Sequence, residues 1–122
     1  MSRSEEMRLA EAELRFAELV WDREPLSSGE LVQQCERELN WKKSTTYTVL
    51  RRVCQKGILQ NENGMVTSRM TRAEYEAICS EQFLRDNFDG SLPRFLAAFM
   101  SRKKLIPRQI EEIQRVIDSY GE

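Results

Sequence analysis

The sequence predicts a mainly helical chain in which one short β-hairpin separates a helical first half from an amphipathic, helical last half. Three observations predict this fold class. Apolar residues recur at helical spacing over most of the 122 residues. Asn63-Gly64 lies between two short β-compatible runs, which is the strongest short hairpin signal in the chain. A Ser or Thr followed three residues later by Glu, a pattern typical of helix starts, precedes two of the apolar runs.

Three helices are expected before the hairpin, over residues 10–23, 29–38 and 43–56. Pro25 stops the first helix, and Ser27 with Glu30 forms a capping-box pattern at the start of the second. The expected inward-facing residues are Leu14, Ala17, Leu19, Val20 and Trp21 in the first helix, Leu31, Val32, Cys35 and Leu39 in the second, and Thr46, Val49, Leu50 and Val53 in the third.

The hairpin is expected over residues 57–70, with Gly57 just after the end of the third helix. Three more helices should follow. The first runs over about 72–87 behind the capping-box pair Thr71 and Glu74. The second begins at a Ser91 cap, and the third lies within residues 106–121.

Positive charge gathers in one stretch of a chain whose formal net charge is −1. Residues 41–60 contain five bases and no acid, whereas residues 1–40 contain ten acids and five bases. A solvated helix face usually mixes the two signs, because opposite charges three or four residues apart attract each other. The absence of acids therefore indicates that this stretch faces something negatively charged.

The composition makes an enzymatic role and a metal or cofactor site improbable. The chain contains no histidine, and Cys35, Cys54 and Cys79 are far apart and fit small buried positions on helices. Its five glycines form no phosphate-binding loop. Because no signal peptide and no long apolar run is found, we expect a cytoplasmic protein with reduced thiols and no membrane contact.

Three short helices followed by a hairpin are the elements of a winged helix-turn-helix domain. In that arrangement the third helix enters the major groove of DNA, and the hairpin, called the wing, approaches the backbone. The third helix would expose hydroxyl and basic side chains that suit phosphates and base edges. The expected DNA-binding residues on it are Lys42, Lys43, Ser44, Thr45, Tyr47, Thr48, Arg51 and Arg52. Lys56, at the far end, is expected only to offset the helix dipole.

The same basic face leaves a second interpretation open. The domain could be a winged-helix protein-interaction module whose basic face docks an acidic protein partner. The near-neutral net charge is compatible with this alternative. Binding to duplex DNA distinguishes the two interpretations.

Trp41, Thr45 and Thr48 are followed by Leu50, Arg52, Val53, Lys56, Gly57 and Leu59 in a spacing that resembles the penicillinase-repressor family of bacterial winged-helix regulators, which includes methicillin-resistance and copper-response repressors. Two further segments are similar to that family: AELRFAELVWDREPLSSGELV upstream and FLRDNFDGSLPRFLAAFM downstream. The resemblance therefore covers roughly residues 10–120. It implies a homodimer that binds a palindromic operator in double-stranded DNA and represses transcription.

The resemblance implies roles for single residues of the third helix. Thr45, Thr48 and Arg52 stand where the family has the Thr, Thr and Arg of its recognition helix. Its variable contacting positions are occupied by Ser44, Tyr47 and Arg51.

The chain also departs from the family's pattern. Lys42 stands where the family usually has a Ser N-cap, so we expect Ser44 to cap the helix and to start it later. The wing lacks the family's first Arg and its aromatic residue, and Arg69 is expected to supply a phosphate contact instead. The cysteine-pair tail of copper-responsive members is absent, which speaks against copper sensing.

The second half of the chain resembles the family's dimerisation segment. We expect a DNA-binding domain over residues 8–72 and a helical dimerisation region over 73–122. The apolar faces of the helices in residues 73–122 exceed what one three-helix core can cover. This surplus favours burial between two chains over closure of a monomeric core. The expected dimerisation residues are Phe83, Leu92, Phe95, Leu96, Phe99, Met100, Ile110, Ile113 and Ile117.

One further family property remains open for this chain. In β-lactam-responsive members, a partner membrane sensor triggers cleavage at an Asn-Phe bond in the dimerisation segment. The matching pair here is Ala98-Phe99, which keeps the Phe and lacks the Asn. Phe99 is therefore expected to be dimer core, and a sensor or protease partner is left open.

Overall fold

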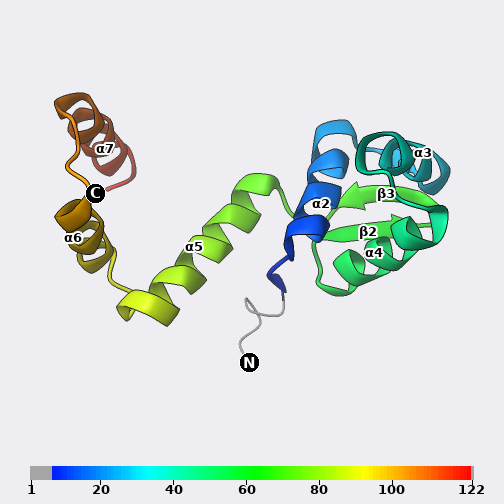
Figure 1. The fold of residues 1–122 in the computed structure, drawn as a ribbon, viewed down its shortest axis with the longest axis horizontal. Helices are drawn as coiled ribbons and strands as arrows, with labels where there is room; N and C mark the ends of the chain where they lie inside the picture. The colour runs from blue at the N-terminus through cyan, green and yellow to red at the C-terminus, as the bar shows by residue number, and fades with distance from the viewer. Residues whose placement is uncertain (1–6, 122) are drawn as a thin grey trace. The chain divides into compact units, whose positions relative to one another are not determined.

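The computed structural model describes residues 7–121 and divides the chain into two compact units, one ending at Gln82 and the other beginning at Phe83. In the first unit, three helices pack around a small sheet (Figure 1). The elements are α2 (Glu11–Arg23), β1 (Leu26–Ser27), α3 (Ser28–Leu39), α4 (Lys43–Gln55), β2 (Leu59–Glu62), β3 (Met65–Ser68), α5 (Arg72–Phe88), α6 (Leu92–Arg102) and α7 (Pro107–Tyr120).

The predicted fold class is confirmed, because the chain is mainly helical and carries a small antiparallel sheet between its helical parts. The sheet has the strand order β1-β3-β2. Strand β1 is missing from the sequence prediction. It pairs with β3 through Leu26 and Val66, and its two residues are too few to show the alternation that identifies a strand in a sequence.

The predicted hairpin turn is confirmed at Asn63-Gly64. Both residues have positive φ angles, 52° and 85°, as a tight two-residue hairpin turn requires. The Asn61 side chain accepts a hydrogen bond from the Gly64 N–H at 3.0 Å. The Gly64 carbonyl accepts one from the Ser28 N–H at 2.7 Å, so the tip of the wing is bound to the start of α3.

One hydrophobic core holds the first unit together. The predicted inward positions of α4 are confirmed, since Thr46, Val49, Leu50 and Val53 are all buried. Phe16 of α2 is fully buried as well, although the predicted apolar stripe of that helix omits it. Its ring stacks on Trp41, with centroids 5.9 Å apart. The largest fully buried side chains are Phe16, Leu31, Ile58, Leu59, Val20, Val53 and Val66, together with Thr46 and Cys35.

The predicted helix caps hold at three of four places. Ser27, Thr71 and Ser91 accept hydrogen bonds from backbone N–H groups three residues ahead. The expectation for Ser44 is wrong. Helix α4 already begins at Lys43, because Lys42 is extended and its carbonyl accepts the first helical hydrogen bond, from the Thr46 N–H at 3.1 Å. Ser44 therefore lies inside the first turn and starts no helix.

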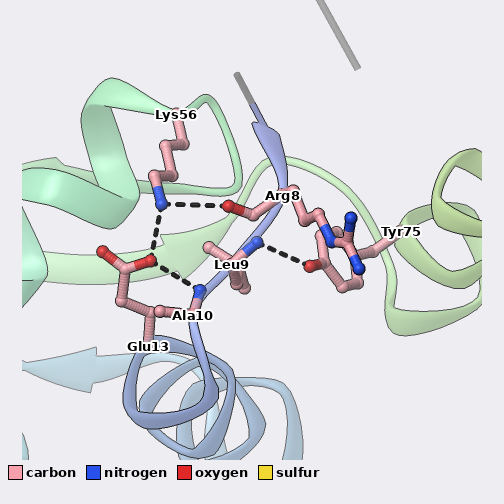
Figure 2. Close-up of polar contacts among 6 residues, drawn as sticks. All are labelled: Arg8, Leu9, Ala10, Glu13, Lys56 and Tyr75. Carbon is pink, nitrogen blue, oxygen red and sulfur yellow. Dashed lines mark hydrogen bonds and ion pairs between the residues drawn. The ribbon is translucent and has the colours of Figure 1, made fainter. Parts of the chain in front are cut away.

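A short N-terminal strap, residues 7–10, ties the first unit together at the end of α4 (Figure 2). The buried Leu9 N–H donates to the Tyr75 hydroxyl of α5 at 2.8 Å. The Lys56 ammonium donates to the Arg8 carbonyl at 3.0 Å and to Glu13 of α2 at 2.5 Å. Lys56 thus does more than offset the dipole of α4, because it forms a mostly buried ion pair with Glu13.

The second unit differs from the first in having little interior. No residue of α6 or α7, both described over their full lengths, is buried. Phe95 of α6 makes ring contacts with Phe83, Phe88 and Phe99 at centroid distances of 5.4 to 6.2 Å. Phe83 and Phe99 nevertheless remain nearly half exposed. The unit therefore presents apolar surface that its own helices leave uncovered.

We expect the stability of the first unit to fall at acidic pH because of Glu13. Burial raises the pKa of this carboxyl group, but hydrogen bonds from Lys56 and from the Ala10 N–H, with the charges of Lys56 and Arg52, bring the pKa below its ordinary value of 4.5. A lowered pKa in the folded state stabilises the fold above pH 4.5, and this contribution is lost as the pH falls through the folded-state pKa. Denaturant titrations across this range measure it.

The Glu13→Gln variant should lose about 1–3 kcal/mol of unfolding free energy at neutral pH, because the mostly buried Lys56 ammonium loses its counter-charge and its charge-assisted hydrogen bond becomes a weaker one to a neutral amide. The loss should shrink as the pH falls. The control is Glu11→Gln, which removes an exposed carboxylate paired with Arg15 and should cost less than about 1 kcal/mol. An equal loss at neutral and acidic pH would contradict the role assigned to the ionised carboxylate.

Candidate nucleic-acid interface

Helix α4 is fixed in the first unit by one face and is free on the other. Its buried side contacts α2, α3 and β2. The remaining face carries hydroxyl and basic side chains. The structure places these predicted DNA-binding residues at exposed positions: Lys42, Lys43, Ser44, Thr45, Thr48, Arg51 and Arg52.

The bases of α4 and its N-cap lack the carboxylate partners that Arg15, Arg23 and Arg72 of the same unit have. Arginines on α2 and α5 form ion pairs with acids of α2 and α3, namely Arg15 with Glu11, Arg23 with Glu38 and Arg72 with Asp22. Among residues 7–121, no carboxylate lies within ion-pair distance of Lys42, Lys43, Arg51 or Arg52. The face therefore carries positive charge without ion pairs, which suits a polyanion.

Spacing along α4 identifies one residue that the sequence prediction omits. Ser44, Thr48 and Arg51 lie four and three residues apart, which places them on the middle of the exposed face. Gln55 follows at the next position of the same row and is also exposed. A glutamine amide both donates and accepts hydrogen bonds, as adenine recognition requires. The helical period alone would have been enough to include it.

Tyr47 occupies a different place from the other predicted contacts. Its side chain is half-buried, and its hydroxyl donates to the Ser28 hydroxyl at 3.4 Å. Tyr47 and Arg51 line a surface depression of about 280 Å³ together with Asn61 of the wing. Tyr47 therefore lies at the rim between α4, the start of α3 and the wing, and only part of its ring is open to a ligand.

The wing offers little to a phosphate backbone at its tip. Residues 60–65 contain no base and one acid, Glu62, and the exposed side chain next to the turn is the apolar Met65. Arg69, the predicted substitute, is exposed and follows the end of β3, where its N–H donates to the Ile58 carbonyl at 2.8 Å. The structure thus places the positive charge of the hairpin at its base.

The residues predicted to form a dimer interface gather in the second unit. Phe83, Leu92, Phe99, Met100, Ile110 and Ile117 are between 41% and 51% exposed. Phe95, Leu96 and Ile113 are half-buried. Ala98, next to Phe99, is exposed as well. Large apolar side chains that are exposed to this extent make the second unit a candidate surface for association with another chain.

Residues 7–121 hold neither a metal-binding cluster nor a membrane-spanning helix. No group of three or more His, Cys, Asp and Glu side chains there could hold a metal ion. Cys35 is buried, as predicted, whereas Cys54 and Cys79 are half-buried. No helix in this part of the chain is long and apolar enough to cross a bilayer.

Known proteins with similar sequences identify the family. The family described as "Penicillinase repressor" matches residues 9–119. The penicillinase repressor of Bacillus licheniformis is 22% identical over 116 residues, which cover 92% of this chain and 91% of that protein. The match spans both units and confirms the resemblance seen in the sequence. The chain belongs to the penicillinase repressor family, whose members are DNA-binding repressors of transcription.

Proposed function

We propose that the protein represses transcription as a homodimer that inserts α4 of each protomer into the major groove of a palindromic operator. The observation that carries the proposal is the exposed face of α4, which is hydroxyl-rich, basic, free of acids and without carboxylate partners among the described residues. A helix that lies between two phosphate backbones needs such a face, because an acid there would be repelled.

The side chains of this face divide into two kinds of contact. Arg51 can place its forked guanidinium group on the O6 and N7 atoms of guanine, and Ser44 and Thr48 are small enough to approach base edges. Lys42 and Lys43 stand at the start of α4, where no side chain caps the helix. The first backbone N–H groups of α4 are thus open to a phosphate that the two ammonium groups also attract.

The remaining predicted residues would hold the helix in register. Thr45 and Arg52 flank the middle row on one side, and Tyr47 flanks it on the other, next to the wing. Contacts of this kind to phosphate and sugar position a protein on DNA without reading its sequence. Arg69 belongs to the same class of contact.

Uncovered apolar surface in the second unit supports the homodimer. Ile110, Ile113, Ile117 and Tyr120 of α7 follow each other at intervals of three and four residues, the spacing of a seam between paired helices. Val116, Gln109 and Gln114, which flank this row, carry no charge that would repel an identical helix. A two-fold dimer would also present two copies of α4 to two half-sites of one operator.

We expect Thr48→Val and Arg51→Ala to weaken operator binding and to relax its sequence preference. Thr48→Val keeps the shape of the side chain and removes the hydroxyl group, while Arg51→Ala removes a candidate guanine contact. Each should cost roughly 5- to 150-fold in affinity for the operator, the equivalent of one good base contact. Fluorescence anisotropy with an operator selected from random duplexes measures the affinity.

The matched control is Arg37→Ala, which removes an exposed base of α3, outside the proposed interface. It should leave the ratio of operator to unrelated-duplex affinity unchanged. If Thr48→Val and Arg51→Ala also leave that ratio unchanged, α4 is not the recognition helix. If the wild-type chain shifts no duplex in moderate salt and instead binds acidic proteins, the interaction-module interpretation replaces the proposed one.

We expect Ile117→Glu to convert the protein from dimer to monomer, because it places a charge in the apolar row of α7. Sedimentation equilibrium measures the mass, and circular dichroism shows whether the first unit stays folded. Ser119→Glu, which introduces the same side chain on the opposite face of α7, is the control and should remain dimeric. A dimeric mass for the Ile117→Glu variant would remove α7 from the interface.

A further inference from the structure

A surface depression of about 370 Å³ lies at the end of α4, away from the start of the helix where the proposed base contacts begin. The strap, the last turn of α4 and the base of the wing all contribute to its wall. Three of its lining residues are bases, namely Arg52, Lys56 and Arg69, and none is an acid. The other lining residues are Met7, Cys54, Gln55 and Gly57.

The three bases differ in how their charges are balanced. Lys56 is neutralised by Glu13, to which its ammonium group donates at 2.5 Å, and Figure 2 shows that the same group is also bound to the Arg8 carbonyl. Arg52 and Arg69 have no carboxylate partner between residues 7 and 121, and both are exposed. The charge of Arg52 also acts on Glu13, so one carboxylate offsets part of the three positive charges around this depression and the lining keeps an excess of positive charge.

The backbone of the depression also leaves room for a ligand. Gly57 has a φ angle of 84°, and the space where a Cβ atom would stand holds no other atom within 4 Å. Like charges brought to one concave site repel each other unless an anion lies between them. Guanidinium groups suit oxyanions in particular, because their planar fork donates two parallel hydrogen bonds to phosphate oxygens.

We propose that this depression binds a phosphate group, held by Arg52 and Arg69. Lys56 stays bound to the strap and contributes a fixed positive charge behind the site. The phosphate comes either from the DNA backbone beside the operator half-site or from a free phosphorylated small molecule. The first source rests on the proposed function, and the second does not. The site also places a backbone contact at the base of the wing, whose tip has no base.

The DNA source is tested by the salt dependence of duplex binding by Arg69→Gln. The Arg69 side chain is exposed and forms no ion pair with residues 7–121, and its backbone N–H, which donates to the Ile58 carbonyl next to the sheet, is kept in the variant, so the variant should fold. If the site holds a DNA phosphate, the log–log slope of affinity against salt falls by about 0.9 for each phosphate that the variant no longer neutralises, one per protomer. This decrease in slope is the same for operator and unrelated duplexes. Thr48→Val, in contrast, lowers affinity for the operator more than affinity for unrelated duplexes.

The free-ligand source is tested without DNA. Inorganic pyrophosphate is the probe, and thermal unfolding is followed against sodium chloride of equal ionic strength. If the site holds a free phosphate, pyrophosphate raises the Tm of the wild-type chain in a saturable way and does not raise that of Arg69→Gln. Arg37→Gln, which removes an exposed base outside the depression, is the control in both experiments and keeps the wild-type behaviour.

Either result supports the site and names its ligand. If Arg69→Gln matches Arg37→Gln in both the salt slope and the pyrophosphate-dependent Tm, the proposal is overturned. A chain that binds no duplex at all refutes the proposed function and the DNA source together, and the pyrophosphate experiment then decides the proposal alone. Loss of operator preference in Thr48→Val with an unchanged slope in Arg69→Gln keeps the proposed function and removes the DNA source.

Discussion

Burial of one face of α4 is the constraint on which the rest of the first unit depends. Thr46, Val49, Leu50 and Val53 are at most 8% exposed, and fully burying an apolar side chain of this size contributes about 1.5–3 kcal/mol. Successive helical residues are turned by about 100°, so fixing four positions leaves the helix no freedom to rotate. The core therefore determines which residues form the exposed row that begins at Ser44, before any ligand arrives.

The placement of acids follows from the same arrangement. Acids of α2 and α3 form ion pairs with bases on α2 and α5, whereas the exposed bases of α4 form no ion pair with residues 7–121. Like charges four residues apart, such as Arg52 and Lys56 at the end of α4, cost a helix a few tenths of a kcal/mol, which the burial of the other face of α4 offsets. Lys56, at the end of α4, differs from these exposed bases because it forms an ion pair. It lies where α4 meets the strap, and there Glu13 keeps α4, α2 and residues 7–10 together.

Local patterns in the sequence predicted the helices, the Asn63-Gly64 turn and the buried face of α4, because each depends on residues within a few positions of one another. What the sequence could not predict depends on distant partners. The Phe16 ring stacks on Trp41, and the Tyr47 hydroxyl donates a hydrogen bond to Ser28. The Lys56 ammonium group donates to the Arg8 carbonyl and forms an ion pair with Glu13. The cap expected at Ser44 failed for a related reason, since an extended backbone at Lys42 starts α4 without a side-chain cap. Contacts of the candidate site with DNA, and of the second unit with a second copy, stay predictions.

The two units differ in where their stability comes from, and this difference bears on how a repressor of this design would act. The first unit has its own buried core, whereas α6 and α7 bury no residue. On the proposed dimer, the second unit gains its interior from association, so its folding depends on protein concentration. One copy of α4 offers few base contacts, and joining two copies makes the second half-site an intramolecular encounter with a far higher effective concentration. Affinity for a palindromic operator then depends on the apolar surface of the second unit as directly as on the basic face of α4.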